Sequence, residues 1–589
     1  MTTSGTKLRQ ALASSPSDAS AWHELGAAFI RASNAVMAVT AFSRQAILAP
    51  MDAIARVNVA NALKRLSRDD EAARWLRRAQ ALAGSVAPAS ESLANTAWRR
   101  GQTQEARTRY GRALTTSPSD WRSRLGACVA ELPVLYETEA EIESARRAYS
   151  NALGRLEAWS EVAETEELAR FADAVGSVQP FFLAYQARDD RELQARYGRL
   201  LCRALAARHP DLARAPARRE RSDKERLRIG LVSGYFRRHS VWKMALAGWV
   251  EALDRSRFEV FGYHTSAIAD DVTARAAARL DRFLAGPLDR KVLAQRIRDD
   301  RLDFLFYPEI GMDPIAAWLA ALKLAPVQAM SWGHPTTSGY PTMDLFFSSD
   351  LMEPADGATR YVEQLVRLPG LGCLYTPSPV SPAPISRQDA GIGTDDVVYL
   401  CAQSLYKYLP QDDELLARIA DAVPRSRFVF FSGPMPTVTR TFVNRLSRRF
   451  AAAGHDPGSR ILMLPTLTEE GFLGVARHAD VILDSIGWSG FNSTIEVIGH
   501  GVPVVTLPGD SMRSRHTSAT LTKMGLDDMV ASTRDDYVRR AVRLGLDESL
   551  RRTDGSRIAR TLDRLFGDAA PIRAVEAAVL AACAAELRR

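Results

Sequence analysis

One lysine in this chain is suited to holding a phosphate group. The 77 lysines and arginines include only eight lysines, so Lys407 stands out in a chain that nearly always uses arginine. It follows an apolar segment, residues 397–401, that suits a buried strand. A lysine ammonium group is a compact charge that suits a diphosphate, and the alternative is an exposed surface lysine.

A second segment with phosphate-binding character runs from residue 480 to 508. Residues 481–484 and 502–507 are short apolar runs that suit buried parallel strands, and a glycine-broken loop follows the first. Three polar residues can cap the helix that begins after this loop: Asn492, Ser493 and Thr494. A helix N-terminus has unpaired N–H groups and a positive dipole end, so it can hold a phosphate. We therefore predict a nucleotide-diphosphate site here, and a strand–helix–strand unit without a ligand is the alternative.

Four further polar residues follow apolar segments nearer the N-terminus: His239, Glu309, His334 and Thr337. Open parallel sheets bind ligands outside the carboxyl ends of their strands, which is where these residues are expected. A histidine there can serve as a general base near neutral pH. Hydrogen bonding within a loop is the alternative for any single histidine, but three polar strand ends in one region favour a site.

Two α/β lobes are predicted to position these side chains. Strands alternate with helical segments through residues 226–388 and again through residues 389–589, which indicates a doubly wound parallel sheet in each. The expected strands of the first lobe are residues 227–232, 258–263, 303–307, 326–332 and 344–347. Those of the second lobe are residues 397–401, 428–431, 461–464, 481–484 and 502–507. Two such lobes that face each other form a cleft, and the second would hold most of the nucleotide.

Residues 1–120 repeat with a period of 34. Small residues share one phase and large residues another: Ala38, Ala72 and Ala106, then Phe42, Leu76 and Tyr110. Because small side chains let helices approach closely and large ones fill the gaps, the pattern resembles about three tetratricopeptide repeats. Such stacks present a concave surface to a protein or peptide, and a spacer or dimerisation arm is the alternative. Residues 121–225 are expected to form a helical bridge and a linker, in which core packing is favoured over a ligand site for Phe181, Phe182 and Tyr185.

The composition argues against several classes of protein. A hydrophobic content of 46% with 25% charged residues is typical of globular domains, and 589 residues are too many for one core. The arginines behind the net charge of +8 are spread along the chain, so no nucleic-acid partner is expected. Five distant cysteines form neither a disulfide framework nor a metal cluster. No apolar run approaches 18 residues, so a cytoplasmic protein without a membrane span is expected.

With these residues in hand, the chain resembles the glycosyltransferase family of O-GlcNAc transferase and SPINDLY. It is particularly similar to bacterial SPINDLY-like members, which join tetratricopeptide repeats to a two-lobed GT-B catalytic region. The resemblance is strong over residues 225–570 and is carried by residues 227–239, 326–344, 403–407, 480–508 and 514–522. It implies a multidomain protein, with an all-α repeat superhelix followed by two Rossmann-like GT-B lobes.

The resemblance also implies roles for residues on the donor side of the cleft. Lys407 matches the lysine that contacts the donor diphosphate, and Gln403 matches the neighbouring glutamine. The helix-opening segment matches the family's phosphate-binding segment: Asn492, Ser493 and Thr494. Glu496 falls where the family has an acidic residue for the ribose, and His516 lies in the segment after the next strand.

On the acceptor side, His239 matches the family histidine proposed as a base or as an acceptor-positioning group. Glu309 is a second candidate for orienting or deprotonating the acceptor. His334 and Thr337 are also assigned to the acceptor side. O-GlcNAc transferase has a histidine and paired threonines in the stretch that reads Phe-Asn-Ser here, residues 491–493. This departure leaves the donor sugar open.

The implied function is inverting, metal-independent transfer of a sugar from a nucleotide donor, with a UDP-sugar expected and no resident cofactor. The acceptor would be a Ser, Thr or Asn side chain of a protein docked by the repeats. One alternative is a flagellin-type transferase that uses another activated sugar, such as a nonulosonic acid. Others are an enzyme that glycosylates a small molecule or lipid, and a non-catalytic repeat scaffold on a degenerate transferase domain. The sequence leaves the oligomeric state open, and an oligomer is among the states that it allows.

Overall fold

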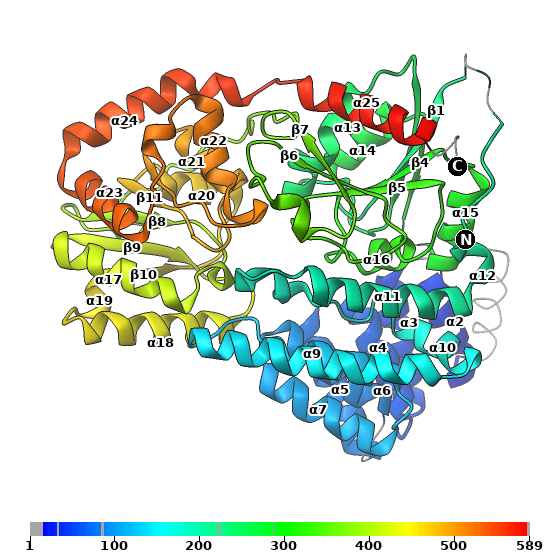
Figure 1. The fold of residues 1–589 in the computed structure, drawn as a ribbon. Helices are drawn as coiled ribbons and strands as arrows, with labels where there is room; N and C mark the ends of the chain where they lie inside the picture. Colours follow the sequence, from blue (N-terminus) through cyan, green and yellow to red (C-terminus); the bar gives the residue numbers. More distant parts are fainter. Residues whose placement is uncertain are drawn as a thin grey trace.

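The computed structural model describes residues 16–585, apart from residues 32–33, 67, 84–86, 221, 223–224 and 287. An all-α region precedes two α/β lobes, each built on a parallel sheet, which confirms the predicted fold class. Figure 1 shows the helical region, in blue to cyan, below the first lobe in green and the second in yellow to orange. The first 15 residues of the predicted repeat segment lie outside the described residues.

Three helical hairpins form the repeat array: α2 (Ala19–Arg31) with α3 (Ala35–Leu48), α4 (Ala53–Arg65) with α5 (Asp69–Ala83), and α6 (Ala87–Arg99) with α7 (Thr103–Thr116). The repeated small residues Ala38, Ala72 and Ala106 are fully buried. A Cβ atom on Gly26 would lie 2.5 Å from the ring of Phe42, so this position has room only for glycine. The period of 34 therefore marks the positions at which the helices touch.

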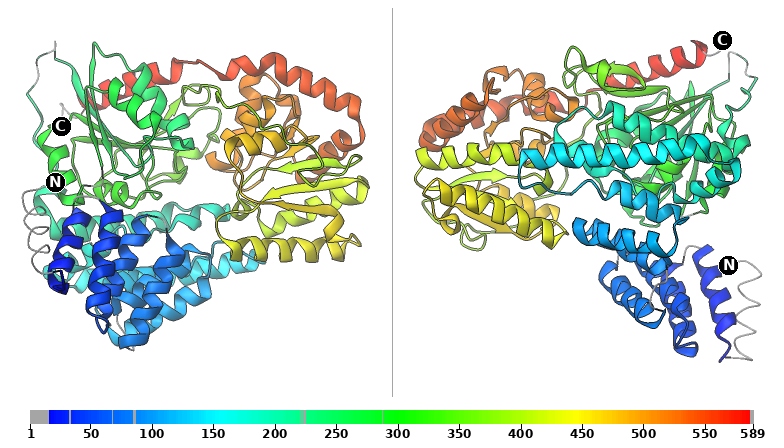
Figure 2. Two further views of the ribbon diagram at one scale, coloured as in Figure 1. Left: turned by 180° about the vertical axis from the view of Figure 1, so that it is seen from behind. Right: turned by 60° about the horizontal axis from the view of Figure 1, so that its bottom comes forward.

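The hairpins are divided between two hydrophobic cores. One core contains buried side chains of residues 25–93, and the other begins at Ala94 and continues into both lobes. Trp98 of the third hairpin packs edge-on against Phe182 of the helical bridge, with ring centroids 5.7 Å apart. The packing therefore runs across the domain limit expected at residue 120. The right view of Figure 2 shows the first two hairpins, in dark blue, projecting from the body.

The helical bridge contains α8 (Trp121–Val129), α9 (Glu139–Val162), α10 (Thr165–Phe171), α11 (Arg191–Arg208), α12 (Pro210–Ala213) and the turns η1 (Ala172–Ala174) and η2 (Phe181–Gln186). Helix α11 lies so close to the first lobe that a Cβ atom on Gly198 would be 2.2 Å from the Gly339 carbonyl oxygen. Asp190, just before α11, pairs with Arg146 of α9 at 2.8 Å and with Arg513 of the second lobe at 2.9 Å. The bridge thus contacts both lobes.

The seven strands of the first lobe are β1 (Leu227–Ser233), β2 (Phe258–His264), β3 (Arg282–Ala285), β4 (Phe304–Tyr307), β5 (Val327–Ser331), β6 (Leu345–Ser349) and β7 (Gln364–Leu368). They are parallel and ordered β3-β2-β1-β4-β5-β6-β7. The accompanying helices are α13 (Ala247–Ala252), α14 (Asp271–Arg279), α15 (Arg290–Asp299) and α16 (Pro314–Ala320). The five predicted strands are present, because each is an apolar run that the sheet buries. The edge strands β3 and β7 are additional.

The five parallel strands of the second lobe are ordered β10-β9-β8-β11-β12: β8 (Val397–Cys401), β9 (Ser426–Phe431), β10 (Ile461–Leu464), β11 (Val481–Leu483) and β12 (Val504–Val505). Its helices are α17 (Asp413–Ala422), α18 (Pro436–Ala452), α19 (Pro457–Arg460), α20 (Glu469–Ala476), α21 (Asn492–Ile498), α22 (His516–Met524), α23 (Arg534–Leu546) and α24 (Glu548–Thr561). All five strands were expected from the sequence, although the last is shorter than predicted.

The C-terminal helix α25 (Ala570–Ala585) returns to the first lobe, whereas the sequence analysis groups it with the second. Its apolar residues Ile572, Val575 and Val579 are buried in the core that contains β1 and β2. A Cβ atom on Gly248 of α13 would lie 2.8 Å from Ile572, so the two helices are in close contact. None of the helices in the described ranges has the length and apolar character to cross a membrane.

Candidate active site

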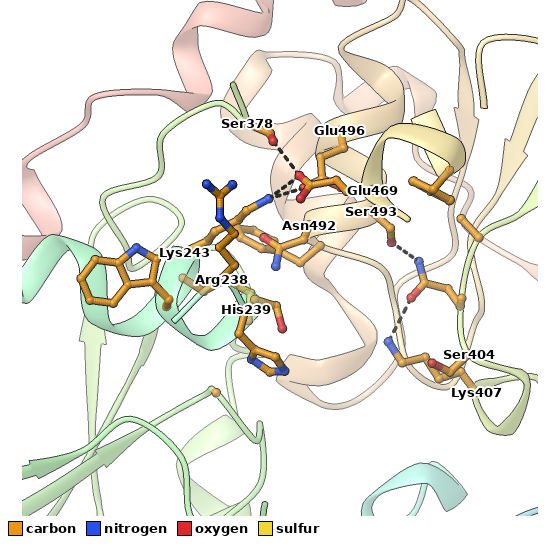
Figure 3. A pocket seen from close by; sticks show the side chains of 18 of the residues that line it. Arg238, His239, Lys243, Ser378, Ser404, Lys407, Glu469, Asn492, Ser493 and Glu496 are labelled. Carbon is orange, nitrogen blue, oxygen red and sulfur yellow. Dashed lines mark hydrogen bonds and ion pairs between the residues drawn. The ribbon is translucent and has the colours of Figure 1, made fainter. Parts of the chain in front are cut away.

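A cleft of about 990 Å³ is lined by both lobes and by the helical bridge. Strand order reverses between β1 and β4 in the first sheet and between β8 and β11 in the second. Such reversals are where open parallel sheets bind ligands. Eight predicted residues line the cleft, part of which Figure 3 shows: His239, His334, Gln403, Lys407, Asn492, Ser493, Glu496 and His516.

Three side chains on the second lobe form a hydrogen-bonded chain along the cleft. Lys407 Nζ donates to Gln403 Oε1 at 2.9 Å, and Gln403 Nε2 donates to Ser493 Oγ at 2.7 Å (Figure 3). Lys407 ends the turn η5 (Leu405–Lys407) after β8, and Ser493 lies in the first turn of α21 after β11. Burial lowers the pKa of Lys407 to about 8, against the opposing effect of the Asp484 carboxylate. The lysine is therefore mostly charged at pH 7. The hydrogen bonds show that the two segments predicted to hold a phosphate lie side by side.

The loop between β11 and α21 is shaped by Asp484. This buried carboxylate accepts hydrogen bonds from Ser489 Oγ at 2.6 Å, from the Gly490 N–H at 2.7 Å and from Thr506 Oγ1 at 2.7 Å. A Cβ atom on Gly490 would lie 2.3 Å from Gln403 Nε2, so glycine is needed to make room for that side chain. Asp484 therefore positions the loop that carries the site.

Helix α21 begins without the side-chain caps that the sequence predicts. Phe491 is its N-cap residue, and no side chain makes a capping hydrogen bond. Ser493 instead turns to Gln403, and Asn492 Oδ1 is buried with no partner among the described residues. The capping prediction is wrong, because Asn492 and Ser493 face the cleft and Thr494 lies against Thr517, so none of them pairs with the backbone of the first turn.

His239 lines the cleft from the turn that follows β1. Its Nδ1 accepts a hydrogen bond from the Val241 N–H at 3.1 Å, and its ring stacks on Tyr235 with centroids 4.2 Å apart. Burial and the nearby Arg237 charge lower the pKa of His239 to about 4, so the ring is neutral at pH 7. A neutral ring whose Nδ1 accepts carries its proton on Nε2. Of the two roles expected for His239, this arrangement favours donating a hydrogen bond over removing a proton.

Replacing His239 with alanine should lower turnover at saturating donor by about tenfold or more while donor affinity stays the same, because the resemblance assigns His239 to the acceptor side. His239→Gln should recover part of the rate, since the glutamine amide can donate from the place of Nε2. Steady-state kinetics and donor titrations on both variants test this. A glutamine variant as slow as the alanine variant would indicate a base, and loss of donor affinity alone would indicate a donor contact.

Glu309 does not line the cleft, although the sequence analysis makes it a candidate catalytic residue. Its side chain is fully buried and accepts hydrogen bonds from Ser233 Oγ at 3.3 Å and from the Asp313 N–H at 3.4 Å. Burial and the neighbouring Asp313 carboxyl raise the pKa of Glu309 well above its usual range. Ser233 Oγ also accepts from the Tyr235 N–H at 3.0 Å, so Glu309 helps to hold the turn that carries His239.

We expect Glu309→Gln to retain turnover within about twofold, because Glu309 does not line the cleft and glutamine keeps the size of its side chain and one acceptor oxygen. Glu309→Ala should lower the melting temperature, since it leaves a cavity and unpaired polar groups. Kinetics and thermal melting of the two variants are the measurement. If the glutamine variant is folded but 100-fold slower, Glu309 takes part in the reaction.

Thr337 and Thr494 also fall outside the cleft lining. Thr337 Oγ1 donates to the buried Glu363 at 2.5 Å, and Thr494 Oγ1 lies 3.3 Å from Thr517 Oγ1. Both hydroxyl groups therefore serve internal hydrogen bonds. The sequence places them correctly after strands, but it does not show which way they point.

A lysine that the sequence analysis does not single out joins the two lobes inside the cleft. Lys243, on the π-helical turn η3 (Trp242–Leu246), pairs with Glu496 at 2.7 Å and with Glu469 at 3.0 Å (Figure 3). Burial raises the pKa of Glu496, and the Lys243 charge opposes that rise. The carboxylate that the resemblance assigns to the ribose is thus held from the opposite lobe. The same scarcity of lysine that points to Lys407 could have pointed to Lys243.

Aromatic side chains from all three parts of the chain line one region of the cleft. Tyr185 of the bridge stacks on Trp488 with centroids 4.0 Å apart, and Phe181 stacks on His334 at 5.0 Å. Lys407 Nζ lies 5.4 Å from the Trp488 ring centre. The sequence favours core packing over a ligand site for these two bridge residues, because nothing in their local pattern shows that the bridge reaches the cleft.

Comparisons with known proteins match this architecture. The model of glycosyl transferase family 41 matches residues 176–371 and 378–567. The probable UDP-N-acetylglucosamine--peptide N-acetylglucosaminyltransferase SPINDLY of Arabidopsis thaliana is 30% identical over 335 residues, which are 55% of this chain and 36% of that protein. The probable transferase SEC of the same plant is 28% identical over 396 residues, 63% of this chain and 39% of that protein. The chain therefore spans little more than a third of the length of these relatives.

A mutant O-GlcNAc transferase of Thermobaculum terrenum has a similar structure, with a TM-score of 0.65 and 24% sequence identity. The alignment covers 99% of this chain and 100% of that one, and it shows a shared fold. The matching family model covers both lobes and the end of the helical bridge, well over half of the residues. The chain belongs to glycosyl transferase family 41.

Proposed function

We propose that this protein transfers a sugar from a nucleotide-sugar donor to a Ser or Thr side chain, or an Asn side chain, of a protein. The observation that carries the proposal is the Lys407–Gln403–Ser493 chain, which sets a positive charge and hydrogen-bonding groups at one end of a two-lobed cleft. A leaving diphosphate develops negative charge as the sugar departs, and a fixed charge at that point stabilises the transition state.

In the proposed reaction the acceptor attacks the sugar carbon on the face opposite the leaving diphosphate, so the configuration inverts as the bond to the diphosphate breaks. The proton of the acceptor passes to an oxygen of the departing diphosphate or to water. Lys407 and Ser493 would hold the diphosphate without a metal ion, and His239 Nε2 would orient the acceptor. Glu496 would bind the ribose hydroxyl groups in the orientation that Lys243 gives it. We propose a UDP-sugar donor because the curated relatives are named for UDP-N-acetylglucosamine.

The repeats would dock the acceptor protein. Their third hairpin is continuous with the core of the lobes, and a Cβ atom on its turn residue Gly101 would lie 2.6 Å from Val438, which lines the cleft. A protein held by the array would therefore have its side chains presented near the cleft. We place the reaction in the cytoplasm, and five buried cysteines that keep their thiol groups fit a reducing compartment.

A thermal-shift panel of nucleotides and nucleotide sugars, followed by intact-mass analysis of co-expressed proteins, tests the proposal. A ligand at 100 times its Kd should add roughly 2.7 kcal/mol of stability. Stabilisation by a UDP-sugar with a matching mass shift on a protein supports it. Stabilisation by a CMP-nonulosonic acid alone would favour the flagellin-type alternative. Donor binding with neither hydrolysis nor transfer would favour a scaffold.

A further inference from the structure

The cleft wall contains a buried histidine that is only half satisfied. His516 begins α22, is 4% exposed and lines the cleft. Its Nδ1 lies 3.1 Å from the backbone oxygen of Ser489, whereas its Nε2 is buried and has no hydrogen-bond partner among the described residues. An unpaired buried polar group costs roughly 1–3 kcal/mol, so such a group at a cleft wall calls for a ligand to pair it.

The tautomer of His516 follows from its one protein contact. A carbonyl oxygen can only accept, so the proton of the neutral ring lies on Nδ1 and Nε2 presents a lone pair. Burial lowers the pKa of His516 to about 3, and the Lys407 charge adds to the shift, so the ring stays neutral at pH 7. A lone pair can pair with a hydroxyl or N–H group, but it repels a phosphate or carboxylate oxygen.

The surroundings of the ring favour the sugar of the donor, rather than its diphosphate or ribose, as that ligand. Two aromatic rings from opposite lobes flank it, Trp332 at 5.6 Å and Phe491 at 6.0 Å between centroids. Lys407, which would hold the diphosphate, is close enough for its charge to act on the ring, whereas the ribose carboxylate Glu496 is paired with Lys243. Asn492 Oδ1, also unpaired and buried, is a second acceptor on this wall.

We propose that His516 is a specificity-determining residue whose Nε2 accepts a hydrogen bond from one hydroxyl group of the donor's sugar. The inference rests on the proposed function, and it adds a chemical requirement: the sugar must present a hydroxyl donor, and no carboxylate, to this wall. It singles out a residue that lies outside the Lys407–Gln403–Ser493 chain and beyond the ribose carboxylate.

The test uses the full chain and isothermal titration with UDP, UDP-glucose, UDP-galactose, UDP-N-acetylglucosamine and CMP-N-acetylneuraminic acid. His516→Phe keeps a ring against Trp332 and Phe491 but removes the lone pair. His516→Gln keeps an acceptor oxygen near Nε2 and is the second variant. At least one neutral sugar should bind the wild type more tightly than UDP does. His516→Phe should lose roughly tenfold of that gain with UDP affinity unchanged, and His516→Gln should recover part of it.

Deoxy analogues of the favoured sugar then separate a direct contact from a structural role. Removal of one particular hydroxyl should weaken binding to the wild type by roughly tenfold and have no further effect in His516→Phe, as expected for two halves of one hydrogen bond.

Several results would overturn the inference. Equal loss of UDP affinity in His516→Phe would assign the residue to the diphosphate. Additive effects of the deoxy sugars and the variant would show that the two do not touch. A wild type that binds UDP but gains nothing from any neutral sugar, or that prefers the carboxylated one, would refute the inference and leave the nucleotide site standing. Binding of no nucleotide at all would refute the proposed function together with it.

Discussion

Replacing Lys407 with alanine is expected to reduce sugar transfer by about 100-fold or more while the protein remains folded. The ammonium group lies next to Gln403 and within the cleft, where it would neutralise charge that develops on the leaving diphosphate. Losing such a contact costs a few kcal/mol of transition-state stabilisation, and each 1.36 kcal/mol is a factor of ten in rate. Transfer to a protein acceptor and hydrolysis of the donor should fall together.

Lys291→Ala is the matched control, because this lysine is exposed on α15 and does not line the cleft. It should leave both rates unchanged. Near-normal turnover in a folded Lys407→Ala protein would remove this lysine from the mechanism.

The lowered pKa of Lys407 makes the same prediction depend on pH. As pH rises through about 8, the free enzyme loses this charge, so kcat/KM should fall roughly tenfold per pH unit. The free energy of unfolding should rise with pH over the same range. A lysine whose pKa is lowered from 10.5 in the folded state destabilises the fold while it is charged. The cost is on the order of 3 kcal/mol below pH 8 and disappears above pH 10.5. Lys407→Met should therefore melt above the wild type at pH 7.

Removing residues 1–83 is expected to leave a folded protein that binds donor and modifies a short peptide at high concentration. Modification of the full acceptor protein should fall by roughly 100-fold, because the proposed docking by the array would raise the effective concentration of the acceptor. The cut removes the first two hairpins, whose core is separate from that of the lobes. The cut exposes one face of α6, and replacing Leu93 on that face with a polar residue would make it suited to water.

Removing residues 1–120 should have a different outcome. This cut takes away Trp98 and Tyr110, which belong to the core that continues into the lobes. Two large side chains contribute about 1.5–3 kcal/mol each by burial, so the melting temperature should drop and donor binding should weaken. Both truncations should be compared by thermal melting, donor titration and transfer. The comparison separates docking of the acceptor protein from support of the folded lobes. Full modification of the acceptor by the shorter truncation would make the first two hairpins a spacer.

The strands that the sequence predicts most directly are apolar runs that the sheet buries, such as residues 397–401 and 481–483. The two missed strands, β3 and β7, lie at the edges of the first sheet, and each has only two half-exposed apolar residues between two exposed ones. Their strand character comes from the neighbour that they pair with, β2 or β6. A single sequence holds no local record of that pairing.

The same limit applies to the residues of the candidate site, because their long-range contacts are not visible in the sequence. Lys407 and Ser493 could be found because residue type and position after a strand both point to them. Glu309 has the right type and position, but its side chain turns into the core. Tyr185 has neither signal, and it reaches the cleft only because the bridge packs beneath the lobes.

The way in which helix α11 is held has a consequence for how tightly substrates are bound. Its backbone touches the first lobe at Gly198, and the carboxylate just before it, Asp190, is shared between Arg146 of the bridge and Arg513 of the second lobe. Swinging the lobes apart would leave that carboxylate, 1% exposed, without one of its partners, at a cost of roughly 3–5 kcal/mol. The entropy of bringing the two walls of the cleft together is therefore lost once, when the chain folds. A preorganised cleft leaves more of each contact's free energy available as affinity for the substrates.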